Sequence, residues 1–250
     1  MLVVGRSSNG RKIWYNVFMP SNWNKGKTKD TDDSVRKISE TMKSKKIDNF
    51  KQWRDKMKAE GKIKAEYLPL KKGGDLAELI GVTLGDGHIC SYPRTEELRL
   101  ISNLNNPRFV TRYAKIMEKI FNKKPYVRNS NQNNSTKIGL YEKHISKRMG
   151  IPSGARKYKK IEVPFWILKN RKYVVRYLRG LYEAEGSHSI HLPTCTYKVQ
   201  FSNRNVSMLE NVYKLVSSLG FHPHKSKNMI QLSKKKEVFR FIKLIKFRKY

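Results

Sequence analysis

Acidic residues are scarce in this 250-residue chain, which has 20 Asp and Glu against 54 Lys and Arg and a formal net charge of +34. Such an excess of cations favours a polyanionic partner, and nucleic acid is the leading candidate. A ribosomal or otherwise generically basic protein is the alternative. The sequence has no apolar run of about eighteen residues and no signal-peptide core, so we expect neither a membrane partner nor secretion.

Cysteine is also nearly absent. Cys90 and Cys195 are the only two, and they do not form a C-x-x-C pair. They suit a reducing compartment and predict no zinc site. His188 and His191 lie near Cys195 in the sequence, but a fourth ligand is missing. We therefore expect a cytoplasmic or organellar protein rather than a secreted one.

Two stretches of the chain end alike, with their final glycines 186 − 87 = 99 residues apart. They are L-I-G-V-T-L-G-D-G at Leu79–Gly87 and L-R-G-L-Y-E-A-E-G at Leu178–Gly186. Each is typical of a helix with two small residues four positions apart, namely Gly81 and Gly85, and Gly180 and Ala184. Small residues at this spacing share one face of a helix and allow another backbone to approach closely. We predict that the two motif helices pack on each other.

An acid follows each pair of small residues, and packing would bring these two acids, Asp86 and Glu185, to one end of the helix pair. Two carboxylates at helix C-termini lie in an unfavourable negative field, which a divalent cation would compensate. Mg²⁺ fits best, with Mn²⁺ or Ca²⁺ as substitutes in binding, and the backbone carbonyls of Gly85 and Ala184 are further ligand candidates. The alternative is two ordinary amphipathic helices with surface acids.

The repeat extends beyond the motifs. S-N-L-N at Ser102–Asn105 and S-N-R-N at Ser202–Asn205 are 202 − 102 = 100 residues apart, and a helix with apolar periodicity follows each. Each copy reads helix, strand, strand, helix, strand, strand, helix. The sequence therefore predicts an α+β fold of two pseudo-symmetric halves that pack through the motif helices.

Apolar and polar residues alternate in the predicted strands. In Tyr197–Ser202 the aromatic and apolar residues share one face of the strand, and the polar residues share the other. An antiparallel sheet with Lys, Arg, Gln and Asn outward is suited to reading the major groove, since Arg and Lys match guanine and Gln and Asn match adenine. The candidates for DNA contact are Arg99, Tyr126, Arg128, Lys137, Lys198, Gln200, Ser202 and Gln231. For any one of them, plain solvated surface is the alternative.

The motifs, their spacing and the unit pattern resemble the LAGLIDADG homing endonucleases in their single-chain, two-motif form. The resemblance covers about 75–250 and includes a bridging segment, K-I-E-V-P-F-W-I at Lys160–Ile167. The first motif departs from the name-giving pattern, since it reads G-V-T-L-G-D-G. The resemblance implies metal-dependent hydrolysis of double-stranded DNA by a monomer at a long, pseudo-palindromic target. Each half would cut one strand across the minor groove and leave a staggered break.

The resemblance also implies residues that order water and stabilise the transition state. Asn103, Asn203 and Arg204 fall where family members carry such groups, and Lys157 and Lys246 are further candidates. The first half has leucine where the second has Arg204, so the two strands are expected to be cut unequally.

We predict three segments: a basic DNA-binding appendage at 1–74, the first LAGLIDADG-type half at 75–160, and a linker with the second half at 161–250. Trp23–Lys43 is similar to the small modules that accompany homing endonucleases and touch DNA. The alternative for the appendage is a flexible basic arm that folds only on DNA.

Two other functions remain open on the same scaffold. One is an RNA-binding maturase that helps an intron to fold. The other is a non-catalytic DNA-binding protein, which the loss of a motif acid would favour. Both acids are present.

Overall fold

The chain folds as two units, Met1–Glu66 and Tyr67–Tyr250, in a computed structural model that describes residues 2–6, 12–16, 23–64 and 66–249. In the smaller unit, β1 (Leu2–Arg6) pairs antiparallel with β2 (Lys12–Asn16), and α1 (Asp33–Ser44) and α2 (Lys51–Ala59) follow. Neither helix has a buried residue, so this unit has no helical core among its described residues.

The larger unit contains the predicted repeat. Its first half consists of α3 (Gly74–Gly85), β3 (Gly87–Tyr92), β4 (Thr95–Asn103), α4 (Pro107–Phe121), β5 (Tyr126–Ser130), β6 (Ser135–Glu142) and α5 (Ile145–Met149). A short helix, α6 (Phe165–Leu168), precedes the second half. That half consists of α7 (Arg171–Glu185), β7 (Gly186–His191), a 3₁₀ turn (Leu192–Thr194), β8 (Thr196–Ser202), α8 (Val206–Ser218), β9 (His224–Ser226), β10 (Met229–Leu232) and α9 (Lys235–Ile245). The predicted α+β fold and the order of elements in both halves are confirmed.

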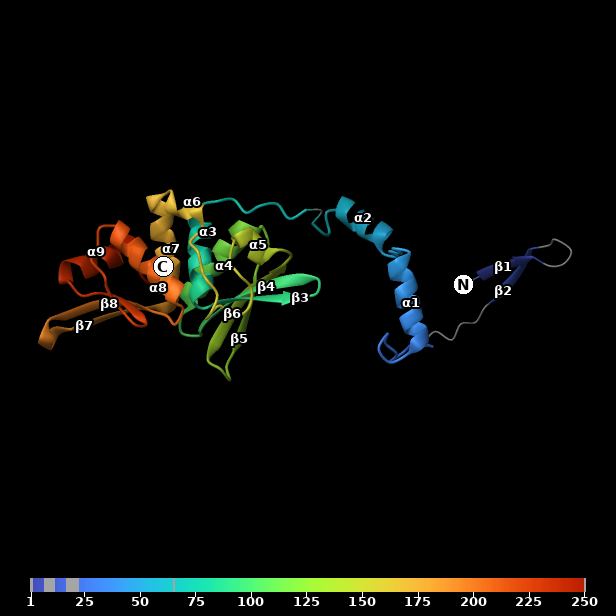
Figure 1. Cartoon of the computed structure of the whole chain (residues 1–250), viewed down its shortest axis with the longest axis horizontal. Coiled ribbons are helices and arrows are strands. Elements are labelled where there is room, and N and C mark those ends of the chain that lie inside the picture. Colours follow the sequence, from blue (N-terminus) through green and yellow to red (C-terminus); the bar gives the residue numbers. More distant parts are fainter. Residues whose placement is uncertain (1, 7–11, 17–22, 65, 250) are drawn as a thin grey trace. The chain divides into compact units, whose positions relative to one another are not determined.

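Each half has a four-stranded antiparallel sheet, with the orders β3-β4-β6-β5 and β7-β8-β10-β9. The register is equivalent in both, since Gly87 pairs with Leu100 and Gly186 pairs with Phe201. Period-two alternation accounts for the burial, because Val199 and Phe201 in β8 face the core while Gln200 between them is partly exposed. Figure 1 shows the two sheets on either side of the α3–α7 pair.

The motif helices α3 and α7 pack with their backbones in contact, as the small residues predict. A β-carbon on Gly81 would lie 2.2 Å from the carbonyl oxygen of Tyr177, and one on Gly180 would lie 2.1 Å from the carbonyl oxygen of Glu78. Both are contacts with backbone, which no side-chain rotation relieves. Glycine is required at these positions because of the close approach of the two helices.

Replacing Gly180 by alanine is expected to lower the free energy of unfolding by about 1–3 kcal/mol, because the methyl group forces the helices apart. Urea unfolding followed by circular dichroism measures the change. Gly73→Ser is the control, since a β-carbon on Gly73 meets nothing within 4 Å and serine is a good residue at the start of a helix. Equal stability of both variants would show that the helices are not held by close packing.

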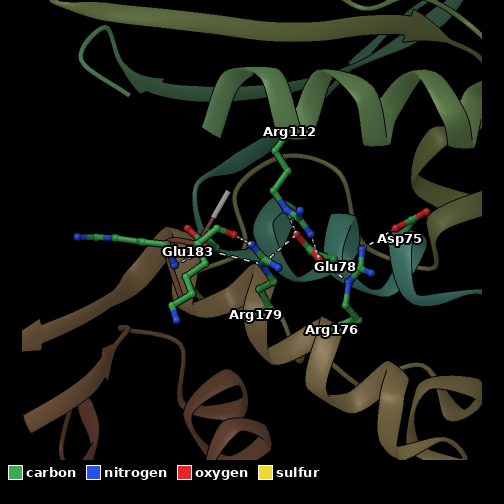
Figure 2. A network of polar contacts seen from close by, with 8 residues as sticks. Asp75, Glu78, Arg112, Arg176, Arg179 and Glu183 are labelled. Atoms are coloured by element: carbon green, nitrogen blue, oxygen red, sulfur yellow. Dashed lines mark hydrogen bonds and ion pairs between the residues drawn. The ribbon is translucent and has the colours of Figure 1, made fainter. Parts of the chain in front are cut away.

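A buried charge network also joins the halves, and the sequence did not predict it (Figure 2). Glu78 of α3 is fully buried and accepts hydrogen bonds from Arg112 of α4, at 2.6 and 2.9 Å, and from Arg176 of α7, at 2.5 Å. Arg179 of α7 lies 3.5 Å from the same carboxylate. Arg176 also donates to Asp75 at 2.5 Å. One carboxylate thus links three helices from both halves.

No helix in the described part of the chain has the length and apolar character needed to cross a membrane.

Candidate active site

The two motif acids lie at the same end of the helix pair. Asp86 caps the C-terminus of α3, and Glu185 is the last residue of α7. A β-carbon on Gly85 would lie 2.4 Å from the β-carbon of Ala184 and 3.2 Å from Cγ of Glu185. The end of α3 therefore touches the residues that carry the second acid.

The two carboxylates interact electrostatically. Burial raises the pKa of Glu185, the negative charge of Asp86 raises it further, and a 3.2 Å hydrogen bond from Asn203 Nδ2 partly opposes both. Asp86 is exposed, yet the protein around its carboxyl group removes part of its hydration and raises its pKa. Both acids also face the negative ends of the helix dipoles. Uncompensated negative charge of this kind favours a bound cation.

The donor set fits a hard divalent ion. Among the described residues, no group of three or more His, Cys, Asp and Glu side chains converges on a metal position. Two carboxylates are nevertheless enough for Mg²⁺, which usually keeps several waters and takes its remaining ligands from substrate phosphates. Asp86 and Glu185 fit such a site, and Gly85 packs against Ala184 next to them. The carbonyls of Gly85 and Ala184 stay predicted ligands.

Two cavities flank the acids, one for each half. Glu185 lines a cavity of about 600 Å³ together with Gly85, and Asp86 lines a cavity of about 490 Å³ together with Ala184. Each cavity thus combines the acid of one motif with the small residue of the other motif. This crosswise arrangement follows from the pseudo-twofold packing of α3 on α7.

Most of the predicted catalytic candidates line these cavities. Asn103 lies in the Asp86 cavity, and Asn203, Arg204 and Lys157 lie in the Glu185 cavity. The two asparagines are equivalent, because each accepts a 2.8 Å hydrogen bond from the backbone N–H two residues later. Lys246 is the left-handed C-cap of α9 and is not among the residues that line either cavity.

Two arginines that sequence reasoning missed also line the cavities. Arg156, in the Glu185 cavity, donates to the carbonyls of Thr83, at 2.7 Å, and Gly87, at the end of α3. Arg248, in the Asp86 cavity, donates to the carbonyl of Gly186 at 3.3 Å, at the end of α7. Each arginine donates to carbonyls at the C-terminal end of a motif helix. The helix dipole is negative there, so a positive charge is stabilised.

The two arginines occupy equivalent positions in the two halves, but the repeat in the sequence does not reveal this. They are 248 − 156 = 92 residues apart, whereas the motif glycines are 99 residues apart. The signal that could have found them is a basic residue a few positions after the last helix of each half. Among the described residues, Nη1 of Arg156 is buried and has no hydrogen-bond partner. This leaves the guanidinium with bonding capacity inside the cavity.

The predicted DNA-contact residues fall into two groups, one on each sheet. Arg99, Tyr126, Arg128 and Lys137 line a cavity of about 340 Å³ on the first sheet. The second group is Lys198, Gln200, Ser202 and Gln231 on β8 and β10. There Gln200 donates to Gln231 at 2.6 Å, and Ser202 lines the Glu185 cavity.

Comparison with known proteins agrees with this geometry in the second half. Residues 172–246 match the family model of the LAGLIDADG-like domain, which confirms the resemblance for this half. No curated protein matches the chain.

Several solved structures are similar to the chain at low identity. A mesophilic variant of the homing endonuclease I-DmoI is 17% identical with a TM-score of 0.48, over 69% of this chain and 94% of that one. I-DmoI in complex with DNA and Ca is 18% identical with a TM-score of 0.47, over 69% and 88%. The N-terminal LAGLIDADG domain of DUF199/WhiA is 15% identical with a TM-score of 0.44, over 71% and 83%.

Proposed function

We propose that this chain is a site-specific endonuclease that cuts both strands of duplex DNA with the help of Mg²⁺ bound at Asp86 and Glu185. The observation that carries the proposal is the meeting of these two acids at the ends of packed motif helices, close enough for the charge of one to raise the pKa of the other. A phosphodiester resists attack because it is anionic and its leaving group is poor. A divalent metal held by Asp86 and Glu185 would overcome both difficulties, because it would activate water and neutralise charge on the leaving oxygen.

The residues around the acids have separate tasks. Asn203 holds the Glu185 carboxylate through its amide, and Asn103 occupies the equivalent place beside Asp86. Arg156 and Arg248 supply positive charge to the two cavities, where it would stabilise the phosphate oxygens in the transition state. Lys157 and Arg204 add further cations only on the Glu185 side. The two strands are therefore cut at different rates.

The proposed substrate is a long, nearly twofold-symmetric duplex. Both halves belong to one chain, so a monomer presents two sheets to two half-sites without a partner subunit. The net charge of +34 supports contact with many phosphates. Residues 1–74, whose two helices bury no side chain, would add contacts with DNA outside the half-sites.

A cleavage selection on randomised duplex DNA with Mg²⁺ tests the proposal. We expect fragments that share one cut site with staggered ends, and no cleavage when the metal is removed by a chelator. Binding should weaken with salt, with a slope of about −0.9 in log–log form for each neutralised phosphate. Specific binding without cleavage would instead indicate a non-catalytic DNA-binding protein, and binding of structured RNA alone would indicate a maturase.

A further inference from the structure

A buried acid lies on the face of the first sheet that points away from the helices. Glu97 of β4 is 3% exposed, although its neighbours on that face, Arg99 and Ile101, remain accessible. Its carboxylate accepts hydrogen bonds from the hydroxyls of Tyr126 and Tyr92, the latter at 3.1 Å. Burial by itself raises the pKa of Glu97, but the two hydroxyls and the charge of Arg99 outweigh it and hold the pKa below its usual value. Glu97 is therefore a stable anion.

The sheet is shaped to let Tyr126 reach this acid. Tyr126 on β5 and Arg99 on β4 both pair with Gly139 on the strand between them. A β-carbon on Gly139 would lie 2.6 Å from the Tyr126 hydroxyl, so only glycine leaves room for the ring to cross β6. Glycine within a strand weakens the strand and often marks a close approach. Here the close approach allows the Tyr126 hydroxyl to donate a hydrogen bond to Glu97.

Arg99 forms a long ion pair with Glu97, and most of its donors make no short hydrogen bond. Nη1 of Arg99 lies 3.9 Å from the Glu97 carboxylate, and Nη2 lies 3.7 Å from Sγ of Cys90. Its Nε is buried and has no hydrogen-bond partner among the described residues. The side chain is 29% exposed and lines the sheet cavity with Arg128 and Lys137. The Arg99 guanidinium thus lies in this cavity between Glu97 and Cys90, with donor capacity that no hydrogen bond among the described residues uses fully.

The second sheet has different chemistry at the equivalent place. Arg99 pairs with Gly139, and its counterpart Gln200 pairs with Gln231. The two glutamine side chains are joined by a 2.6 Å hydrogen bond, and Lys198 stands where the first sheet has its buried acid. The second sheet thus has a pair of neutral amides where the first sheet has the charged guanidinium of Arg99.

We propose that Glu97 is a positioning residue that aims Arg99 at a guanine in the first half-site, whereas Gln200 and Gln231 select an A·T pair at the equivalent position of the second. The inference rests on the proposed DNA binding and deepens it. Arginine pairs with O6 and N7 of guanine through two donors, and glutamine pairs with N6 and N7 of adenine. The target is therefore asymmetric at this position, although the fold is pseudo-symmetric.

Base preference is the measurement that tests the inference. The full chain and its variants would be selected on duplex DNA with both half-sites randomised, in Ca²⁺, and the bound sequences counted at every position. In Glu97→Gln and Arg99→Met we expect the preference for guanine at one position of the first half-site to fall about tenfold or more. All positions of the second half-site should keep their preferences. Glu118→Gln, an exposed acid on α4, is the control and should keep the full profile.

The outcomes separate positioning from stability. If Glu97 only stabilises the sheet, Glu97→Gln will lower the affinity for all DNA sequences equally and leave the base preference unchanged. That result would overturn the inference. Tyr126→Phe removes one hydrogen bond from Glu97 and should give a smaller loss of the same guanine preference. An unchanged base profile in Arg99→Met would overturn the inference while leaving the endonuclease proposal intact. A native chain that enriches no sequence would overturn both.

Discussion

Asp86→Asn and Glu185→Gln will each abolish double-strand cleavage while specific binding is retained. Each change keeps the size of the side chain and removes the charge that would bind the metal in the proposed site. Metal catalysis contributes several kcal/mol to phosphodiester hydrolysis, so the rate should fall roughly a thousandfold or more. Cleavage of a selected target measures the rate, and gel-shift titration in Ca²⁺ measures binding.

Glu118→Gln is the matched control, because it removes an acid from an exposed helical position away from the cavities. It should cleave at the native rate. Native cleavage by either motif variant would contradict the assignment of the metal site. If one variant still cut one of the two DNA strands, each acid would be required for the cleavage of one strand. The two separate cavities are consistent with such a division.

The pH profile gives a second measurement of the same site. Both acids have raised pKa values, Glu185 through burial and then the charge of Asp86, and Asp86 through the partial loss of hydration around its carboxyl group. A carboxyl group must lose its proton to bind metal, so a raised pKa shifts the loss of metal binding to higher pH. Cleavage should therefore decline on acidification above the pH at which ordinary carboxylates titrate. Removal of the charge in Asp86→Asn should lower the pKa of Glu185, which NMR titration can follow.

The second large effect concerns stability. Glu78→Gln is expected to lower the free energy of unfolding by about 3–5 kcal/mol, because it leaves buried arginine charge without its partner. Glu78 is fully buried, and the side chain of Arg179 beside it is only 5% exposed. Urea unfolding of the full chain measures the change, with the larger unit contributing the main transition.

Glu162→Gln is the control for this effect. Glu162 also forms an ion pair, at 2.7 Å with Lys160, but its side chain is 74% exposed. Exposed pairs contribute about 0–1 kcal/mol, so this variant should unfold nearly as the native chain does. A Glu78→Gln variant that is equally stable would show that the network in Figure 2 contributes little to holding the halves together.

The network adds a polar link to the apolar core, which already runs through both halves. Gly81 and Gly180 bring the backbones of α3 and α7 together but provide no side chain to bury. Arg112 reaches the same acid from α4, so the first half is tied to the motif pair at a second point. Close backbone packing and buried charge thus share one interface.

Local pattern was enough to predict the motif helices, the repeat and the meeting of the two acids. Small residues four positions apart share a helical face, and each motif has its acid directly after them. Asp86 and Glu185 could therefore be placed at one end of the helix pair without coordinates. The alternation in β8 predicted which side chains face away from the core for the same reason. These features depend only on the geometry of a single element.

Only the tertiary structure decided which partners these elements bring to one another. Glu97 lies on the outward face of β4 with Arg99, but its burial depends on Tyr126 crossing a glycine in another strand. Arg156 reaches the end of α3 from about seventy residues further along the chain, and Glu78 gathers arginines from two other helices. Such contacts are set by strand register and by the packing of distant segments, which no local periodicity records.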